Sequence, residues 1–458
     1  MQSSIQELSQ RLRARELSPV DLTKDCLARI EKVDPLLNAF ITITADSALA
    51  EAHRAESEIQ RGEWRGPLHG IPLAIKDLID TADILTTAGS AQFAKRIPSE
   101  DADVVRRLKD AGAILLGKQN LHEFAYGGSS VVSHYGPVRN PWNPARISGG
   151  SSGGSAASVA AGMGYASIGT DTAGSIREPA AFCGIVGLKP TYARVSAHGV
   201  FPLSRSLDHI GPITQTVADA AILLQVIADP EAKDFSGYPM DIPDYMSMLN
   251  ENPNDLRVGI PRSFFYEELD PEIASAVDQA LSVIKAIAGE MREVSVSLEG
   301  DRTLQQAESY AAHADLVART PGLYQAETLR RIMQGENFTP AEILEGRRKL
   351  SQSRLEIQRV FEEVDVLVTP TTPIAAPVLA QLEEHPETLR PAELVMLRNT
   401  RPFNVWGIPA ISVPCGFTKA GLPIGLQISG AAWQEATILQ LAHAYEQATE
   451  WHKRSPNL

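Results

Sequence analysis

The stretch GGSSGGSAASVAAGMGYASIGTDTAGSIREPAAFCGIVGLKP, residues 149–190, decides how this sequence folds, because a glycine- and serine-rich start leads into an apolar end. Tracts of glycine and serine are usually flexible linkers. Here alanine, isoleucine and valine fill the gaps between the glycines, and a linker has no need to bury such residues. We therefore interpret the stretch as part of a folded core and not as a linker.

The whole chain has the composition of a globular protein, with 458 residues, 43% hydrophobic and 21% charged. A formal net charge of -14 disfavours direct binding to nucleic acid or to an anionic membrane. The three cysteines are too few, and odd in number, for a disulfide framework, which indicates a reducing compartment. No apolar run approaches the roughly 18 residues of a membrane span. We expect a cytoplasmic protein that acts on small uncharged molecules.

The segments before and after this stretch alternate between helical and strand patterns. In IPLAIKD, Ile71, Leu73 and Ile75 alternate with other residues, which predicts a strand with Lys76 on the face opposite the isoleucines. DADVVRRLKDAGAILLGKQN then predicts a helix, a glycine stop and a strand. Such alternation favours an α/β fold, a sheet covered by helices.

The chain shows no long linker, so we expect one domain over residues 1–458. It would consist of a helical N-terminal cover (1–60), a core with the candidate catalytic residues (61–225), a mainly helical substrate-side region (226–360) and a return to the core sheet with a C-terminal helix (361–458).

Three common site types do not fit the sequence. Gly149-x-Ser151-x-Gly153 matches the nucleophile elbow of α/β-hydrolases, but that motif follows a hydrophobic strand, and the two prolines of the preceding NPWNPARIS disfavour a strand. A phosphate-binding loop would have a lysine where GGSSGGSA has serine and alanine. His122-Glu123 lacks the second histidine of a metal motif. We predict no metal and no cofactor.

A serine nucleophile remains, and it needs a base and an oxyanion hole. Thr172, Ala173 and Gly174 offer consecutive backbone N–H groups beside Ser175. No histidine lies in a comparable motif, which makes Lys76 the better candidate base. A lysine acts as a base only when burial or nearby positive charge lowers its pKa towards neutrality.

These segments together resemble the amidase signature family of serine hydrolases. The resemblance rests on PLAIKD, NPWNP, GGSSGGSAA, GTDTAGSIREPAAFCGIVGLKPTYARVS, SLDHIGPIT, DVLVTPTTP and IPAISVPCGFTKAGLPIGLQISG, in this order. It implies a central mixed β-sheet covered by helices on both faces, and no cofactor. It also implies that Ser175 is the acyl-forming nucleophile, Ser151 a bridging serine after a cis peptide bond and Lys76 the base, with the oxyanion held by N–H groups of residues 172–175.

Two residues depart from the family's usual pattern. Ala173 stands where many members have glycine, which matters only if the turn requires a positive φ there. Glu178 follows Arg177 where glutamine or an apolar residue is frequent, and it puts substrate preference in question. We interpret Asp171 and Arg177 as a structural ion pair or hydrogen-bond scaffold around the site.

The substrate pocket is less well defined by the sequence. Tyr126, Phe403 and Trp406 are candidate apolar walls, with core packing as the equal alternative, and Gly127 and Gly128 join them as candidate substrate-binding residues.

One branch of the family is the glutaminase component of the tRNA-dependent amidotransferase, which works only together with partner chains. In that branch an aspartate twelve residues before the proline of GxPAISVPCG is thought to bind the glutamine amino group, and Leu397 stands there in this chain. We therefore expect a stand-alone hydrolase of neutral amides, aryl acylamides (anilides) or carbamates, without nucleic-acid or membrane partners and possibly a homodimer. The alternatives are the amidotransferase glutaminase, a catalytically silent assembly component or a lipid-amide hydrolase.

Overall fold

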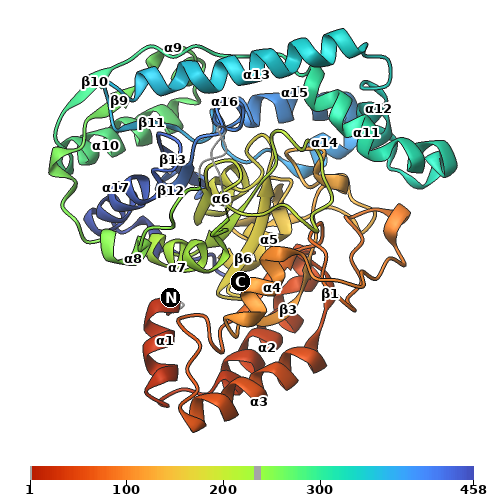
Figure 1. The fold of residues 1–458 in the computed structure, drawn as a ribbon, viewed down its shortest axis with the longest axis vertical. Helices are drawn as coiled ribbons and strands as arrows, with labels where there is room; N and C mark the ends of the chain where they lie inside the picture. Colours follow the sequence, from red (N-terminus) through yellow and green to blue (C-terminus); the bar gives the residue numbers. More distant parts are fainter. Residues whose placement is uncertain (1–2, 232–238) are drawn as a thin grey trace.

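The computed structural model describes residues 3–231 and 239–458 (Figure 1). Residues 1–2 of the predicted helical cover and residues 232–238 of the predicted mainly helical region lie outside the described residues.

An eleven-stranded sheet runs through the centre of the molecule. Its strands, in spatial order, are β1 (Phe40–Ile43), β3 (Ile114–Gln119), β2 (Pro72–Lys76), β6 (Ala166–Asp171), β8 (His209–Thr214), β7 (Val186–Lys189), β12 (Ala410–Phe417), β13 (Pro423–Gly430), β11 (Val366–Pro370), β9 (Val258–Ile260) and β10 (Met291–Glu293). The inner strand β2 pairs in parallel with β3 and β6, whereas β8, β7, β12 and β13 pair with their neighbours in antiparallel fashion. The predicted mixed sheet is therefore confirmed.

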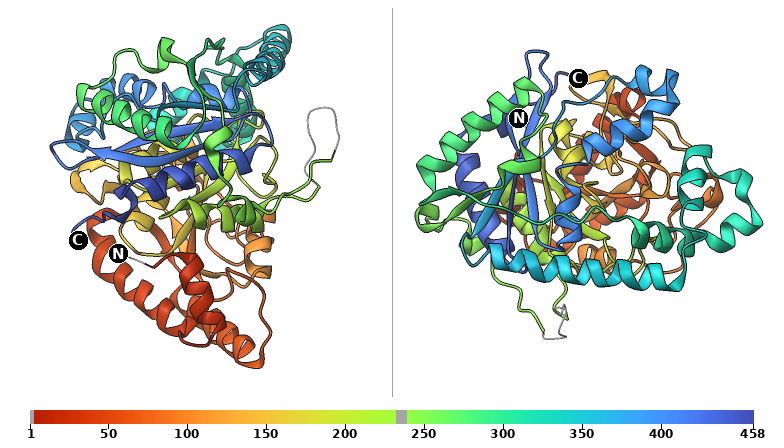
Figure 2. Two further views of the ribbon diagram at one scale, coloured as in Figure 1. Left: turned by 90° about the vertical axis from the view of Figure 1, so that its left-hand side faces the viewer. Right: turned by 90° about the horizontal axis from the view of Figure 1, so that it is seen from above.

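Helices lie on both sides of this sheet (Figures 1 and 2). The α-helices are α1 (Ile5–Arg13), α2 (Pro19–Leu37), α3 (Ala45–Arg61), α4 (Asp103–Asp110), α5 (Gly153–Ala160), α6 (Arg177–Cys183), α7 (Val217–Ile227), α8 (Tyr245–Met248), α9 (Arg262–Phe265), α10 (Pro271–Ile287), α11 (Thr303–Arg319), α12 (Ala326–Met333), α13 (Pro340–Val360), α14 (Leu379–Glu384), α15 (Pro386–Met396), α16 (Arg401–Val405) and α17 (Glu435–Ala448). The predicted helix covering of both faces is confirmed.

The alternation of side chains along β2 assigns its residues to the two faces of the sheet. Leu73 and Ile75 belong to the largest hydrophobic cluster, which also contains residues of α1, α4, α7, α10 and α17. Ala74 packs in a second cluster with residues of α2 and α5. Since alternate residues of a strand share a face, Lys76 lies on the same side as Ala74, opposite Ile75, as the sequence predicts.

Two elements differ from the sequence predictions. Residues Asn143–Ile147 form a strand, β5, although the prolines of NPWNPARIS argue against one. This strand pairs only with β4 (Arg139–Asn140) in a separate two-stranded ribbon, where a proline without an N–H is tolerated. It does not belong to the central sheet, so the nucleophile elbow stays excluded. Within the region predicted as mainly helical, β9 and β10 extend one edge of the sheet.

Within residues 3–231 and 239–458, no helix has both the length and the apolar character needed to cross a membrane.

Candidate active site

Lys76 ends strand β2 and points into the interior beside the glycine- and serine-rich loop. Its Nζ lies 2.7 Å from Ser151 Oγ, 2.9 Å from Ser152 Oγ and 2.8 Å from Thr170 Oγ1. The side chain is fully buried. Burial lowers the pKa of Lys76 to about 7, against the opposing effect of Asp171 and Asp208. Lys76 is thus positioned and tuned to exchange a proton with a serine hydroxyl near neutral pH.

Ser151 and Ser152 precede helix α5, and Ser175 lies in the turn between β6 and α6. The Gly150–Ser151 peptide bond is cis, the conformation that the resemblance implies. The backbone N–H of Ser152 donates to the carbonyl of Ser175 at 3.2 Å, which holds the two segments together. Among the described residues, no hydrogen bond engages the Ser175 hydroxyl. The structure therefore joins Lys76 to Ser151 directly and places Ser175 in the adjoining turn.

The turn that carries Ser175 is fixed by the carboxylate of Asp171. Asp171 Oδ1 accepts from Gly174 N–H at 2.7 Å, and Asp171 Oδ2 accepts from Ile176 N–H at 3.1 Å. This corrects the predicted oxyanion hole, because the N–H of Gly174 is already used. The N–H groups of Thr172, Ala173 and Ser175 have no hydrogen-bond acceptor among the described residues and stay candidates.

The turn requires a glycine only at position 174. Gly174 has a φ of 135°, and a Cβ there would collide with Thr400. Ala173 is not among the residues with positive φ, so alanine fits the backbone at this position.

A buried ion pair supports the turn from behind. Arg177 Nη2 lies 2.9 Å from Asp171 Oδ1, and both side chains are fully buried. Burial alone would raise the pKa of Asp171, but the charge and hydrogen bonds of Arg177 lower it instead. The predicted scaffold role of this pair matches the geometry.

Glu178 lies under the loop that leads to Ser151. Its Oε2 accepts from Gly150 N–H at 2.8 Å, while Oε1 has no partner among the described residues. Burial raises the pKa of Glu178 well above its ordinary value, and the nearby Glu393 and Asp171 raise it further. Glu178 is thus held as a neutral carboxylic acid, which resembles the amide of glutamine in shape and charge.

The candidate substrate-binding residues divide into two groups. Gly127 and Gly128 pack tightly, since a Cβ on Gly127 would overlap the His122 ring and one on Gly128 would lie 2.9 Å from Leu397 Cδ1. Leu397 also approaches Gly174, so the position found by counting from the C-terminal motif does lie beside the turn of Ser175.

The aromatic candidates lie deeper. Phe403 and Trp406 stack edge-to-face at 5.1 Å inside a hydrophobic cluster with Phe265, which favours core packing over a pocket wall. Tyr126 is buried, and its carbonyl accepts from Arg331 Nη1 at 2.6 Å.

The sequence analysis missed a group of arginines around Tyr126. They are Arg302, Arg331, Arg390 and Arg401. No spacing in the sequence indicates this group, because its members come from α12, α15, α16 and the residue before α11. It also missed Ser152 and Thr170 as partners of Lys76, although both adjoin residues that it did consider.

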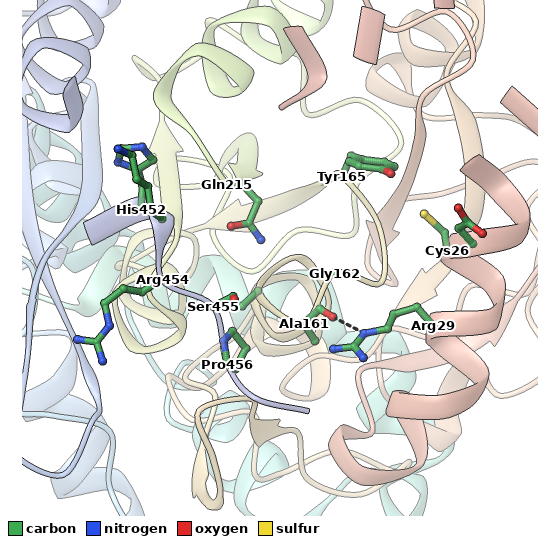
Figure 3. Close-up of a pocket in the computed structure, with 13 residues that line it drawn as sticks. Cys26, Arg29, Ala161, Gly162, Tyr165, Gln215, His452, Arg454, Ser455 and Pro456 are labelled. Atoms are coloured by element: carbon green, nitrogen blue, oxygen red, sulfur yellow. Dashed lines mark hydrogen bonds between the residues drawn. The ribbon is translucent and has the colours of Figure 1, made fainter. Parts of the chain in front are cut away.

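A separate cavity of about 340 Å³ lies at the far end of α5 (Figure 3). Arg29 borders it and donates from Nε to the carbonyl of Ala161 at 2.9 Å, and residues 452–456 close the opposite side. None of the candidate catalytic residues lines this cavity.

Comparison with known proteins assigns the family. The family model described as Amidase matches residues 21–439. This chain belongs to the amidase family.

Two curated amidase relatives carry names that make them components, each called the A component, of glutamyl-tRNA(Gln) amidotransferase. That of Carboxydothermus hydrogenoformans is 40% identical over 99% of this chain and 99% of its own length. That of Chloroflexus aurantiacus is 42% identical over 98% of this chain and 96% of its own length.

Solved amidase structures agree in fold. A chain described under "An unexpected vestigial protein complex reveals the evolutionary origins of an s-triazine catabolic enzyme" is 32% identical, with a TM-score of 0.89 and coverage of 97% and 98% of the two chains. The 6-aminohexanoate cyclic dimer hydrolase in complex with substrate is 30% identical, with a TM-score of 0.89 and coverage of 99% and 98%.

These relatives correct two predictions. The predicted stand-alone hydrolase of neutral amides, anilides or carbamates is wrong, because full-length relatives at about 40% identity are named as components of an amidotransferase, which was the stated alternative. The predicted partners, a small neutral substrate and possibly a second copy without nucleic acid, are wrong for the same reason. The absence of a charged partner for an amino group at Leu397 was given too much weight as evidence for a stand-alone enzyme.

Proposed function

We propose that this chain is the amidase component of an amidotransferase, which hydrolyses the side-chain amide of a donor molecule and releases ammonia for a partner chain to use. The observation that carries the proposal is the fully buried Lys76 with its Nζ 2.7 Å from Ser151 Oγ, next to the turn of Ser175. The names of the full-length relatives support the assembly.

The proposed reaction begins with neutral Lys76. It accepts the proton of Ser151 while Ser151 Oγ takes the proton of Ser175, and Ser175 Oγ attacks the amide carbon. The C–N bond then breaks, the proton returns through Ser151 to the nitrogen, and ammonia leaves. Water attacks the acyl-enzyme by the same route and releases the carboxylate.

The carbonyl oxygen becomes negative during this attack and needs backbone donors. The free N–H groups of Thr172, Ala173 and Ser175 lie in the turn that Asp171 holds. The finer assignment to the cytoplasm is part of the proposal and is supported by three free, buried cysteines.

The test measures ammonia released from L-glutamine and from a panel of other primary amides, with the chain alone and with candidate partner chains co-purified. We expect release that increases with the partner, and loss of at least about a thousandfold in Ser175→Ala and Lys76→Ala. Ser196→Ala is the matched control, because Ser196 Oγ binds Asp103 and no site residue.

A fluorophosphonate probe gives a second measurement that needs no substrate. It should label the wild type at Ser175 and not label Ser175→Ala. Labelling elsewhere, or a wild type that neither reacts with the probe nor releases ammonia with any partner, would refute the proposal.

A further inference from the structure

The arginine group beside the candidate active site carries more positive charge than its acidic neighbours balance. Arg331 Nη1 lies 2.6 Å and Arg390 Nη1 3.6 Å from Glu393 Oε2, so two guanidinium groups share this carboxylate. Arg331 also pairs with Glu327 at 2.7 Å.

The remaining two arginines have no acidic partner among the described residues. Arg401 donates only to the backbone carbonyls of Glu299 and Asp301, at 3.0 Å and 2.6 Å. The guanidinium of Arg302, just before α11, makes no hydrogen bond or ion pair with any residue that the structure describes. Four guanidinium groups therefore face two carboxylates, those of Glu393 and Glu327.

This group adjoins the proposed reaction centre. Glu393 Oε1 accepts from Ser129 Oγ at 2.8 Å, and the backbone of Ser129 lies against Gly150, next to Ser151. Arg331 Nη1 binds the carbonyl of Tyr126, immediately before the Gly127–Gly128 loop that packs on Leu397. The arginines thus surround one side of the loop that faces the turn of Ser175.

The electrostatics of the arginines are consistent with an absent anion. Burial, followed by the charges of Arg401 and Arg390, lowers the pKa of Arg302 to about 9. Burial likewise lowers the pKa of Arg390. A buried cation is normally paired, and a carboxylate between Arg302 and Arg390 would supply the missing charge and form charge-assisted hydrogen bonds.

The same side of the site offers nothing to an ammonium group. Leu397, between Gly128 and Gly174, is apolar. Glu178 is held neutral, Glu393 is shared by two arginines, and Asp171 is paired with Arg177. An ammonium placed here would be repelled by the arginines and would find no free carboxylate among these residues.

We propose that Arg302 and Arg390 form a carboxylate-binding subsite, and that the amide donor is a monoamide of a dicarboxylic acid without a free amino group. This inference rests on the proposed amidase function and specifies its substrate. Carboxylate recognition by Arg302 orients the chain of the donor, and its far amide reaches Ser175.

Three substrates of nearly equal length separate the contributions. Glutaramate (glutaric acid monoamide) has the carboxylate and the amide, L-glutamine adds the amino group, and pentanamide lacks the carboxylate. Ammonia release is measured with the chain in the partner complex that gives full activity. We expect kcat/KM for glutaramate to exceed that for each of the other two by about tenfold or more.

The variant Arg302→Gln removes the charge at the proposed subsite. It should lower kcat/KM for glutaramate about tenfold or more, mainly through KM, and leave pentanamide within about twofold. Arg319→Gln is the matched control, because Arg319 is an exposed arginine of the adjoining helix α11. Labelling of Ser175 by the fluorophosphonate probe verifies that the variant is folded at the reaction centre.

The outcomes distinguish the two proposals. Equal rates for glutaramate and pentanamide, or equal losses on both in Arg302→Gln, overturn the carboxylate subsite. Faster turnover of L-glutamine than of glutaramate overturns the exclusion of the amino group and leaves the proposed amidase function intact. No ammonia from any of the three overturns the amidase function, and this inference with it.

Discussion

Lys76 makes the proposed activity depend on pH in a defined direction. Burial lowers its pKa to about 7, and only the neutral amine can accept the proton of Ser151. We expect log kcat/KM for amide hydrolysis to rise by one unit per pH unit below about pH 7 and to level off above it. A rate profile between pH 5.5 and 9 measures this, and a flat profile in a stable enzyme would exclude Lys76 as the base.

Glu178 provides the second prediction for a single residue. Its pKa is raised, so the folded state retains a proton that the unfolded state loses above the ordinary carboxyl pKa, and its contribution to stability decreases as pH rises above that value. Glu178→Gln removes this effect and keeps a planar group that can accept from Gly150 N–H. We expect the variant to gain stability relative to the wild type between pH 5 and pH 8, in urea unfolding at each pH.

The result that contradicts this interpretation is equally clear. If the wild type and Glu178→Gln show parallel stability over that pH range, Glu178 is ionised in the folded protein. Activity of the variant at pH 7 should stay within about threefold, because the neutral side chains are nearly isosteric.

Single residues also define what the sequence could predict. Lys76, Ser151 and Ser175 carry recognisable motifs, and the structure brings the first two into contact. The use of Gly174 N–H by Asp171 could not be predicted, because it depends on the side-chain conformation of a residue three positions away. Arg302 and Arg390 are 88 positions apart in the numbering, and only the packing of helices brings them into one group.

At the scale of elements, one arginine connects the turn of Ser175 to three neighbouring segments. Arg177, the first residue of α6, binds Asp171 of β6, Asn404 of α16 at 2.7 Å and Gln427 of β13 at 2.7 Å. The motif around Ser175 predicts the pair with Asp171. The contacts with Asn404 and Gln427 follow from the sheet order, in which β12 and β13 lie next to β7.

We expect Arg177→Met to lower the free energy of unfolding by about 3–5 kcal/mol, because Asp171 would be left buried without its counter-charge. Labelling of Ser175 by a fluorophosphonate should slow in parallel, since the turn loses its anchor. The double variant Asp171→Asn/Arg177→Met removes both charges and should recover part of the stability. A double variant as unstable as the sum of the two single variants would show that the pair does not couple.

At the scale of the whole molecule, the order of the strands interleaves distant parts of the chain. The C-terminal strands β11, β12 and β13 lie between β7 and β9, so the N-terminal and middle segments pair through them. The two termini lie near each other in all three views (Figures 1 and 2). The four regions expected from the sequence share this one sheet and have no separate cores.

This arrangement predicts one cooperative unfolding transition, although chains of this length often unfold in several steps. Differential scanning calorimetry should give a single peak, with a calorimetric enthalpy close to the van't Hoff value. The sharpest comparison is a chain that lacks residues 3–61. It loses α2 and α3 and exposes Ala74, Ile114 and Leu116 on the sheet. We expect this truncated chain to aggregate and not to melt at a lower temperature as an intact remainder. A second, separate peak in the full chain, or a folded truncated chain that still reacts with the fluorophosphonate, would mean that the N-terminal helices form an independent unit.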